Sequence, residues 1–314
     1  MKNAVIEVIK PGLSTSIQDL GRVGYQQFGM VVAGAMDPFA LQVANILVGN
    51  SRGTAGIEVV VMGPKLKFLR DTVIAICGAN LSPALDGKPI PMWHSERVEK
   101  GQELTFGKPM DGSYAYIAVS GGITTKEIMG SRSTYVKARI GGLTGDFLTK
   151  GDFLPAGEPE LDKAGRWLKG NLIPDYNKPR KIRVILGPDK HAFTETGLNT
   201  FLTNTYEITT KTDRMGARLN GESIEHAAEA DIISDAILPG TVQVPANGKP
   251  IILLADRQPT GGYTRIATVI SEDIPRIAQS LPGKEVAFEA VSLTLAQNLY
   301  KRRERVLKML SKME

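Results

Sequence analysis

The segment ADRQPTGGY, residues 255–263, holds the residue types in this sequence that most readily do chemistry. It places Asp256, Arg257 and Gln258 directly after the apolar run PIILLA. A strand that ends in an acid, a cation and an amide, and then turns through a glycine pair, displays these groups at a barrel rim. Backbone amides in such a turn can also hold an anion. An Asp256–Arg257 ion pair that braces a tight turn explains the same residues equally well.

A glutamine on a neighbouring predicted strand is a further candidate. Gln243 stands between two valines in GTVQVP, and side chains alternate between the two faces of a strand. Its amide therefore points away from the valines, either into a cavity or, as in ordinary alternation, towards solvent.

The N-terminal stretch SIQDLGRVGYQQFG, residues 16–29, fits neither helical nor strand periodicity. Its three glycines, with one acid and one base, indicate a structured turn or part of a site, and an Asp19–Arg22 brace is the simpler interpretation. Shortly after it, Asp37 precedes the helix-like run PFALQVANIL. Asp37 is most simply the N-cap of that helix, although the helix start could instead receive an anionic ligand.

Polar residues in glycine-rich turns are the last group of candidate functional residues. Asn80 ends CGAN, and Arg132 lies between two serines in GSRST, where its planar guanidinium could hold a carboxylate or a phosphate. The sequence has no phosphate loop, dinucleotide fingerprint or nucleophile elbow, and its three histidines are far apart. No metal site is predicted, so any catalysis would depend on carboxylates, arginines, amides and backbone donors.

Composition indicates a folded protein of ordinary polarity. The chain has 314 residues, of which 42% are hydrophobic and 23% charged, and its formal charge is +5. Much of that excess lies in the C-terminal segment KRRERVLKMLSKME, so a nucleic-acid partner is not predicted. The single cysteine, Cys77, excludes a disulfide within the chain, and no signal peptide or apolar run of transmembrane length is recognised. We expect a cytoplasmic protein without membrane contact.

Short apolar runs punctuated by 33 glycines and 18 prolines predict a mainly β protein with barrel or sandwich architecture. Strands are expected over residues 4–10, 56–63, 65–69, 72–78, 103–107, 114–122, 181–187, 206–211, 241–245, 250–256 and 285–292. Helices are expected over 37–50, 271–281 and from Ser292 onwards. A polar, proline-containing connector over 156–181 suggests two domains, residues 1–178 and 179–314.

The motifs resemble, in order, those of the biotin-dependent carboxyltransferase A/B domain family. The series runs from about Pro11 to Phe288 and includes QDLGR, GAMD, CGAN, AVSGGI, GSRST, TDRMG, VQVP and ADRQPTGGY. The family includes the C subunit of bacterial 5-oxoprolinase, which is also called the antagonist of the KipI kinase inhibitor, and regions of allophanate hydrolase and urea carboxylase. The resemblance implies two cyclophilin-like β-barrel domains with a few short helices and a C-terminal helix.

The resemblance also implies a function within a complex. Stand-alone members act with two further 5-oxoprolinase subunits, A and the KipI-like B. The complex uses ATP, with Mg expected beside it, to cleave 5-oxoproline to L-glutamate. No biotin is expected on this chain. Two alternatives stay open: a regulatory protein that sequesters a KipI-like kinase inhibitor, and a biotin-dependent carboxyltransferase acting on a urea-like amide.

The predicted site combines the motif positions with the candidates above. Its catalytic residues are Asp256, Arg257 and Asp37. Its substrate-binding residues are Gln18, Asp19, Arg22, Asn80, Arg132, Asp213, Arg214, Gln243, Gln258, Gly261, Gly262 and Tyr263. In this scheme the arginines neutralise phosphate or a substrate carboxylate, the carboxylates orient a proton or a metal-bound phosphate, and the amides hold polar substrate atoms. Two positions depart from the family pattern: Thr212 replaces a serine, and Pro259 replaces a threonine and so removes a hydroxyl.

Overall fold

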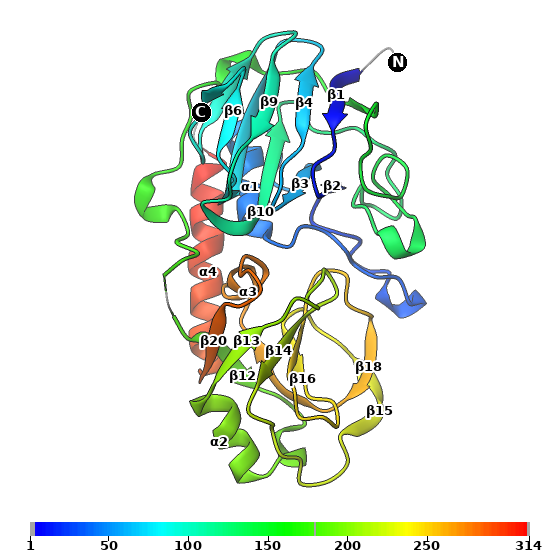
Figure 1. Cartoon of the computed structure of the whole chain (residues 1–314), viewed down its shortest axis with the longest axis vertical. Coiled ribbons are helices and arrows are strands. Elements are labelled where there is room, and N and C mark those ends of the chain that lie inside the picture. The colour runs from blue at the N-terminus through cyan, green and yellow to red at the C-terminus, as the bar shows by residue number, and fades with distance from the viewer. Residues whose placement is uncertain (1–3, 179, 313–314) are drawn as a thin grey trace. The chain divides into compact units, whose positions relative to one another are not determined.

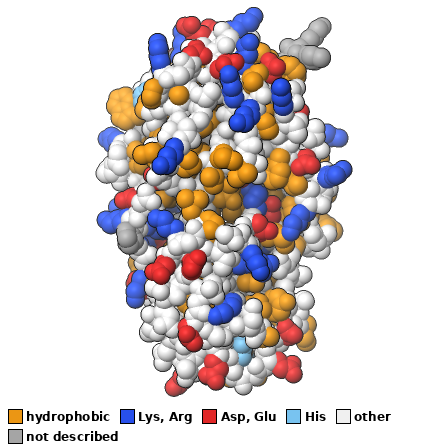
Figure 2. All heavy atoms as spheres, viewed as in Figure 1, with side chains coloured by type: hydrophobic (Ala, Val, Ile, Leu, Met, Phe, Trp, Pro, Cys, Tyr) orange, Lys and Arg blue, Asp and Glu red, His pale blue; other side chains and the backbone are white. Residues whose placement is uncertain are grey.

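The structure, a computed structural model, describes residues 4–178 and 180–312. The chain divides into two compact units (Figure 1). The first contains the residues before Gly24, residues 33–177 and those from Leu307 on, and the second contains residues 24–32 and 178–306. On the face shown in Figure 2, basic and acidic side chains are interspersed.

The first unit contains two mainly antiparallel sheets. The six-stranded sheet has the order β11 (Phe153–Pro155), β1 (Ala4–Lys10), β4 (Lys65–Phe68), β9 (Glu103–Phe106), β6 (Pro83–Leu85), β7 (Lys88–Pro89). The five-stranded sheet has the order β2 (Ser14–Gln18), β3 (Gly56–Val60), β10 (Asp111–Val119), β5 (Thr72–Asn80), β8 (Ser95–Val98). Aliphatic residues of both sheets, among them Ile6, Ile57 and Ile117, form one fully buried core.

The helix expected after Asp37 is confirmed as α1 (Pro38–Leu47). Asp37 is its N-cap, because Asp37 Oδ1 accepts a hydrogen bond from Ala40 N at 3.1 Å, and a proline occupies the first turn, where it costs no intrahelical bond.

The second unit is built on a closed barrel. Its strand order is β12 (Ile182–Leu186), β19 (Arg265–Val269), β16 (Thr241–Gln243), β17 (Ile251–Leu253), β14 (Gly216–Gly221), β13 (Thr205–Ile208), β20 (Glu285–Ala290) (Figure 1). A separate two-stranded ribbon pairs β15 (Asp231–Ala236) with β18 (Thr260–Tyr263). The other helices are α2 (Glu195–Thr203), α3 (Ile274–Ala278) and α4 (Leu293–Leu310). Single 3₁₀ turns occur at Gln26–Phe28, Val136–Ala138, Leu161–Lys163, Gly170–Leu172 and Lys190–Ala192.

The mainly β architecture, the barrel and the C-terminal helix are confirmed, but the expected glycine turn after Pro259 is wrong. Gly261 and Gly262 lie within β18, and Gly261 pairs with Asp235 of β15. The sequence DIISDA of β15 is almost entirely exposed and its two isoleucines are adjacent, so it lacks the alternation of polar and apolar residues that predicts a strand. Without a recognised partner strand, the two glycines suggest a turn. No helix in the described part of the chain is long and apolar enough to cross a membrane.

Candidate functional site

A row of three side chains on the outer face of the barrel forms the floor of the candidate site. Arg218 of β14 pairs with Ile251 of β17, and Ile251 pairs with Gln243 of β16. Side chains at paired positions share one face of a sheet. The adjacent row, made of Ala217, Ile252 and Val242, is fully buried. Because faces alternate along a strand, that row points into the barrel core and the Arg218 row points outwards.

This outer face is hollowed into a cavity of about 220 Å³ within the second unit. Its lining residues come from β14, β16, β17 and β18 and from the segments beside them: Asp213, Met215, Gly216, Arg218, Gln243, Pro245, Ile251, Leu253, Gln258 and Tyr263. Pockets for drug-sized ligands occupy roughly 300–1,000 Å³, so this one suits a smaller molecule. Four predicted substrate-binding residues, Asp213, Gln243, Gln258 and Tyr263, thus lie around one space, and Arg218 is a lining residue that the sequence reasoning missed.

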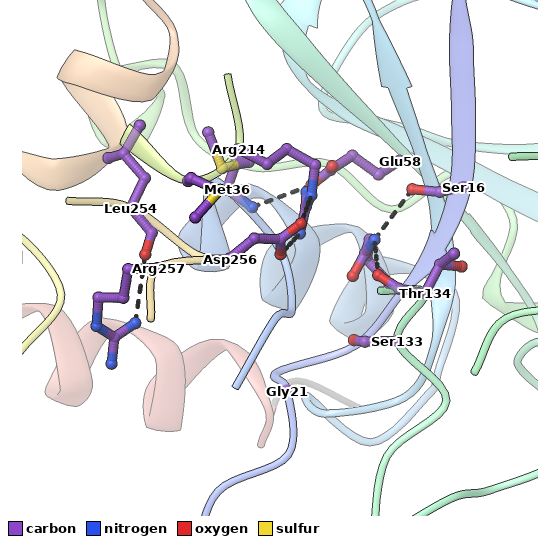
Figure 3. Close-up of polar contacts among 12 residues, drawn as sticks. Ser16, Gly21, Met36, Glu58, Ser133, Thr134, Arg214, Leu254, Asp256 and Arg257 are labelled. Atoms are coloured by element: carbon purple, nitrogen blue, oxygen red, sulfur yellow. Dashed lines mark hydrogen bonds and ion pairs between the residues drawn. The ribbon is translucent and has the colours of Figure 1, made fainter. Parts of the chain in front are cut away.

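Two motif loops of the second unit are joined by a buried ion pair. Arg214 Nε lies 3.0 Å from Asp256 Oδ2 and Arg214 Nη2 lies 2.9 Å from Asp256 Oδ1 (Figure 3), and both side chains are largely buried. Asp256 N also donates to Arg214 O at 2.8 Å, and Leu254 N donates to Met215 O at 2.9 Å. The expected Asp256–Arg257 ion pair is therefore wrong, because Asp256 forms a bidentate ion pair with Arg214 instead.

Arg257 is a buried cation without a carboxylate partner among the described residues. The residue is 6% exposed. Its Nε donates to Ile237 O and its Nη1 donates to Leu254 O, both at 3.3 Å, and Figure 3 shows the second of these bonds. Burial lowers its pKa to about 10, because desolvation disfavours the charged form. The two carbonyl groups only partly offset the free-energy cost of burying this positive charge. A guanidinium held in this way therefore attracts an anion, whose charge would offset the remaining cost.

The ribbon strand β18 approaches Gln243 closely. Gln243 is 2% exposed, and its Nε2 donates to Tyr263 O at 3.4 Å. A Cβ atom added to Gly261 would lie only 2.7 Å from Gln243 Nε2. Because Gly261 has no side chain, the Gln243 amide can lie directly against the ribbon. This close contact, and not an unusual backbone conformation, explains the glycine at position 261.

We expect Gly261→Ala to displace the Gln243 amide, because the new methyl group would overlap it. The side-chain amide signal of Gln243 in a ¹H–¹⁵N spectrum, assigned through its loss in Gln243→Glu, should shift, and the free energy of unfolding should fall by about 1 kcal/mol. Gly262→Ala is the matched control, since its Cβ would meet only Ile232 O at 3.3 Å and Ser234 Oγ at 3.4 Å. An unmoved Gln243 signal in Gly261→Ala would show that the contact is not tight.

In the first unit, Asp19 anchors the loop that contains residues 131–133. Asp19 Oδ1 accepts hydrogen bonds from Gly21 N at 2.8 Å, Ser131 Oγ at 2.7 Å and Ser133 Oγ at 2.6 Å. Asp19 Oδ2 accepts one from Arg132 N at 2.6 Å. A buried carboxylate that receives four donors is satisfied by the chain itself, so this geometry supports a structural role for Asp19.

Gln18 and Arg22 contact the same loop. Gln18 lies at the end of β2, and its Nε2 donates to Ser16 Oγ at 3.0 Å and to Thr134 O at 3.1 Å. Arg22 is fully buried and donates to Ser133 O. The stretch that showed no periodicity therefore begins as a strand and continues as a turn tied to a distant loop.

Asp37 belongs to a buried group of carboxylates and tyrosines that sequence reasoning only partly found. Tyr176 Oη donates to Asp37 Oδ2 at 2.6 Å, and Asp37 N donates to Tyr116 Oη at 2.7 Å. Tyr116 Oη in turn donates to Glu58 Oε2 at 2.8 Å. Burial, followed by the charges of Glu58 and Asp37, raises the pKa of Tyr116 well above its usual value. The sequence feature that could have identified Glu58 as a candidate is its position as the one acidic residue in the apolar run GIEVVV.

The two remaining first-unit candidates have local partners. Asn80 Oδ1 accepts a hydrogen bond from Ser82 N at 3.0 Å, which is a turn contact at the end of β5. Arg132 donates from Nε to Thr125 O at 2.8 Å and from Nη1 to Glu127 Oε2 at 3.1 Å. Within residues 4–178 and 180–312, no three His, Cys, Asp or Glu side chains are placed to share a metal ion.

The fold and the site define a mainly β protein with a small polar cavity on the outer face of a closed barrel. Residues 28–290 match the family described as carboxyltransferase domain, subdomain A and B, and the chain belongs to that family.

Named relatives cover nearly the whole chain. The C subunit of 5-oxoprolinase from Escherichia coli is 35% identical over 309 residues, which are 98% of each chain, and that from Haemophilus influenzae is 35% identical over 96% of each chain. The crystal structure of Kluyveromyces lactis urea carboxylase superposes with a TM-score of 0.93 at 28% identity, covering 99% of this chain and 30% of that protein.

Proposed function

We propose that this chain is the C subunit of an ATP-dependent 5-oxoprolinase, which acts with the A and B subunits to cleave 5-oxoproline to L-glutamate. The observation that carries the proposal is the match to two proteins named as C subunits of 5-oxoprolinase over 96% or more of both chains. A shared domain alone would leave a large part of each relative uncovered, whereas here the match covers 96–98% of this chain and of each named relative.

The second-unit cavity fits this proposal chemically. A lactam is a poor electrophile because amide resonance protects its carbonyl, so it needs polarising contacts and an activated leaving group. The amides of Gln243 and Gln258 both line the cavity and offer a donor and an acceptor to the lactam. ATP would supply activation: transfer of its γ-phosphoryl group to the lactam oxygen would release ADP, addition of water at the activated carbon would break the ring C–N bond, and a second water would release phosphate and leave L-glutamate.

This chain's own contribution to such a step is electrostatic. Arg257 does not line the cavity, but it directly precedes the lining residue Gln258 and is buried without a carboxylate partner among the described residues, so it suits the neutralisation of an anion. The Arg214–Asp256 pair joins the loop that carries the lining residues Asp213 and Met215 to the loop that carries Gln258, and so holds these lining residues in position. Mg would accompany ATP, and no residue of this chain is assigned to it.

A second candidate function is favoured by the match to urea carboxylase, whose structure this chain follows over 99% of its length. In that case the cavity would take a urea-like amide, and the activity would depend on biotin carried by another protein. A cavity of about 220 Å³ accommodates either substrate, so volume alone does not separate the two.

Substrate and inhibitor profiles of the reconstituted complex separate these functions. The full chain, purified with the A and B subunits, should release glutamate from 5-oxoproline only when ATP is present, and avidin should leave the rate unchanged. ATP hydrolysis that depends on urea and is abolished by avidin would favour the carboxyltransferase instead.

A further inference from the structure

Arg218, a cation that lines the cavity, has no side-chain partner within the described residues. Arg218 is exposed, and no ion pair joins it to Asp213 or to any other described carboxylate. Besides its strand pairing, Arg218 makes only backbone hydrogen bonds within the described residues: its N donates to Thr212 Oγ1 at 3.2 Å, and its O accepts from Thr209 N at 2.9 Å. The guanidinium is therefore available to a ligand.

The row Arg218–Ile251–Gln243 sets the spacing of the recognition groups. The two polar residues lie on strands that flank β17, so their backbones are about 9–10 Å apart. Their side chains rise from the same face with the apolar Ile251 between them. A molecule seated on Ile251 meets a guanidinium at one side and an amide at the other.

The other lining groups favour an N–H rather than a second anion. Asp213 Oδ1 is occupied by Met215 N at 2.8 Å and Gly216 N at 3.1 Å, and its carboxylate keeps a further oxygen for an N–H donor. Gln258 adds a second amide, while Leu253 and Pro245 add apolar surface. The cavity thus combines one cation, one acid, two amides and an apolar floor.

We infer that Arg218 is the specificity-determining residue of this cavity and selects small amides that carry a carboxylate over neutral amides. The inference rests on the proposed function for its choice of ligand, since 5-oxoproline is a five-membered lactam with one carboxylate. Urea and 2-pyrrolidinone offer the amide without the anion, so neither would use the guanidinium.

Direct binding to the full chain tests the inference. Dissociation constants for 5-oxoproline, 2-pyrrolidinone and urea should be measured by ligand-observed NMR, without nucleotide. The wild-type chain should bind 5-oxoproline at least about 10-fold more tightly than 2-pyrrolidinone, as expected for one charge-assisted contact. Arg218→Met should remove that preference and leave the affinity for 2-pyrrolidinone unchanged, while Arg218→Lys should keep part of it.

The matched control is Lys211→Met, which removes an exposed cation that does not line the cavity. Equal affinity of the wild-type chain for both lactams, no detectable binding of 5-oxoproline, or an unchanged preference in Arg218→Met would each overturn the inference. Failure of the proposed function looks different: the preference would be present, and the complete complex would still release no glutamate.

Discussion

Replacing Arg257 by methionine is expected to lower ATP-dependent glutamate release by at least about 100-fold while leaving the chain folded. Removal of one preorganised electrostatic group from an active site typically costs two to three powers of ten in rate. The free energy of unfolding should change by less than about 1 kcal/mol, because relief of the desolvated charge offsets the loss of two hydrogen bonds of 3.3 Å.

The two readouts together distinguish a functional cation from a structural one. Glutamate release is measured on the reconstituted complex, and stability is measured by urea denaturation of the chain. Arg257→Lys, which keeps the charge without the planar fork, should recover part of the rate. A variant Arg257→Met that keeps the wild-type rate but loses several kcal/mol of stability would assign Arg257 to the fold.

Replacing Asp256 by asparagine should have the largest effect on stability, a loss of about 3 kcal/mol in the free energy of unfolding. The substitution breaks a largely buried bidentate pair, and Arg214 is left with a neutral amide in place of the carboxylate. Because the two motif loops beside the cavity then loosen, the KM for 5-oxoproline should rise together with the loss of stability.

The same unit offers a matched control for this variant. Arg183 and Asp273 form a second bidentate pair, with distances of 2.8 and 2.6 Å, and neither residue lines the cavity. Asp273→Asn should lower stability by a similar amount without changing KM. If both variants change KM equally, the Arg214–Asp256 pair has no specific influence on the cavity.

Sequence reasoning predicted the strands with strong apolar patterns and the helix after Asp37, because local periodicity and capping determine both. It could not predict the ribbon of β15 and β18, whose exposed residues carry no apolar pattern. The same limit explains the mistaken turn at Gly261: the residue is small because Gln243 lies against it, and that contact joins positions 18 residues apart in sequence.

In the candidate site, too, local sequence patterns predict some features, and only the fold shows the others. Alternation in VQVP correctly placed Gln243 on the face opposite to its valines, but only strand register shows that Arg218 lies in the same row. The partner of Asp256 was missed because Arg214 lies 42 positions earlier, whereas Arg257 is its neighbour in the chain. Partners that are distant in sequence leave no local signal, so pairing them requires the fold.

Omission of this chain from the reconstituted enzyme tests the central claim most directly. Glutamate formed from 5-oxoproline and ATP should be measured for the A and B subunits with the chain and without it, at equal protein concentrations. The proposed function predicts ATP-dependent glutamate release only when all three proteins are present. An equal rate from the A and B subunits alone would contradict it.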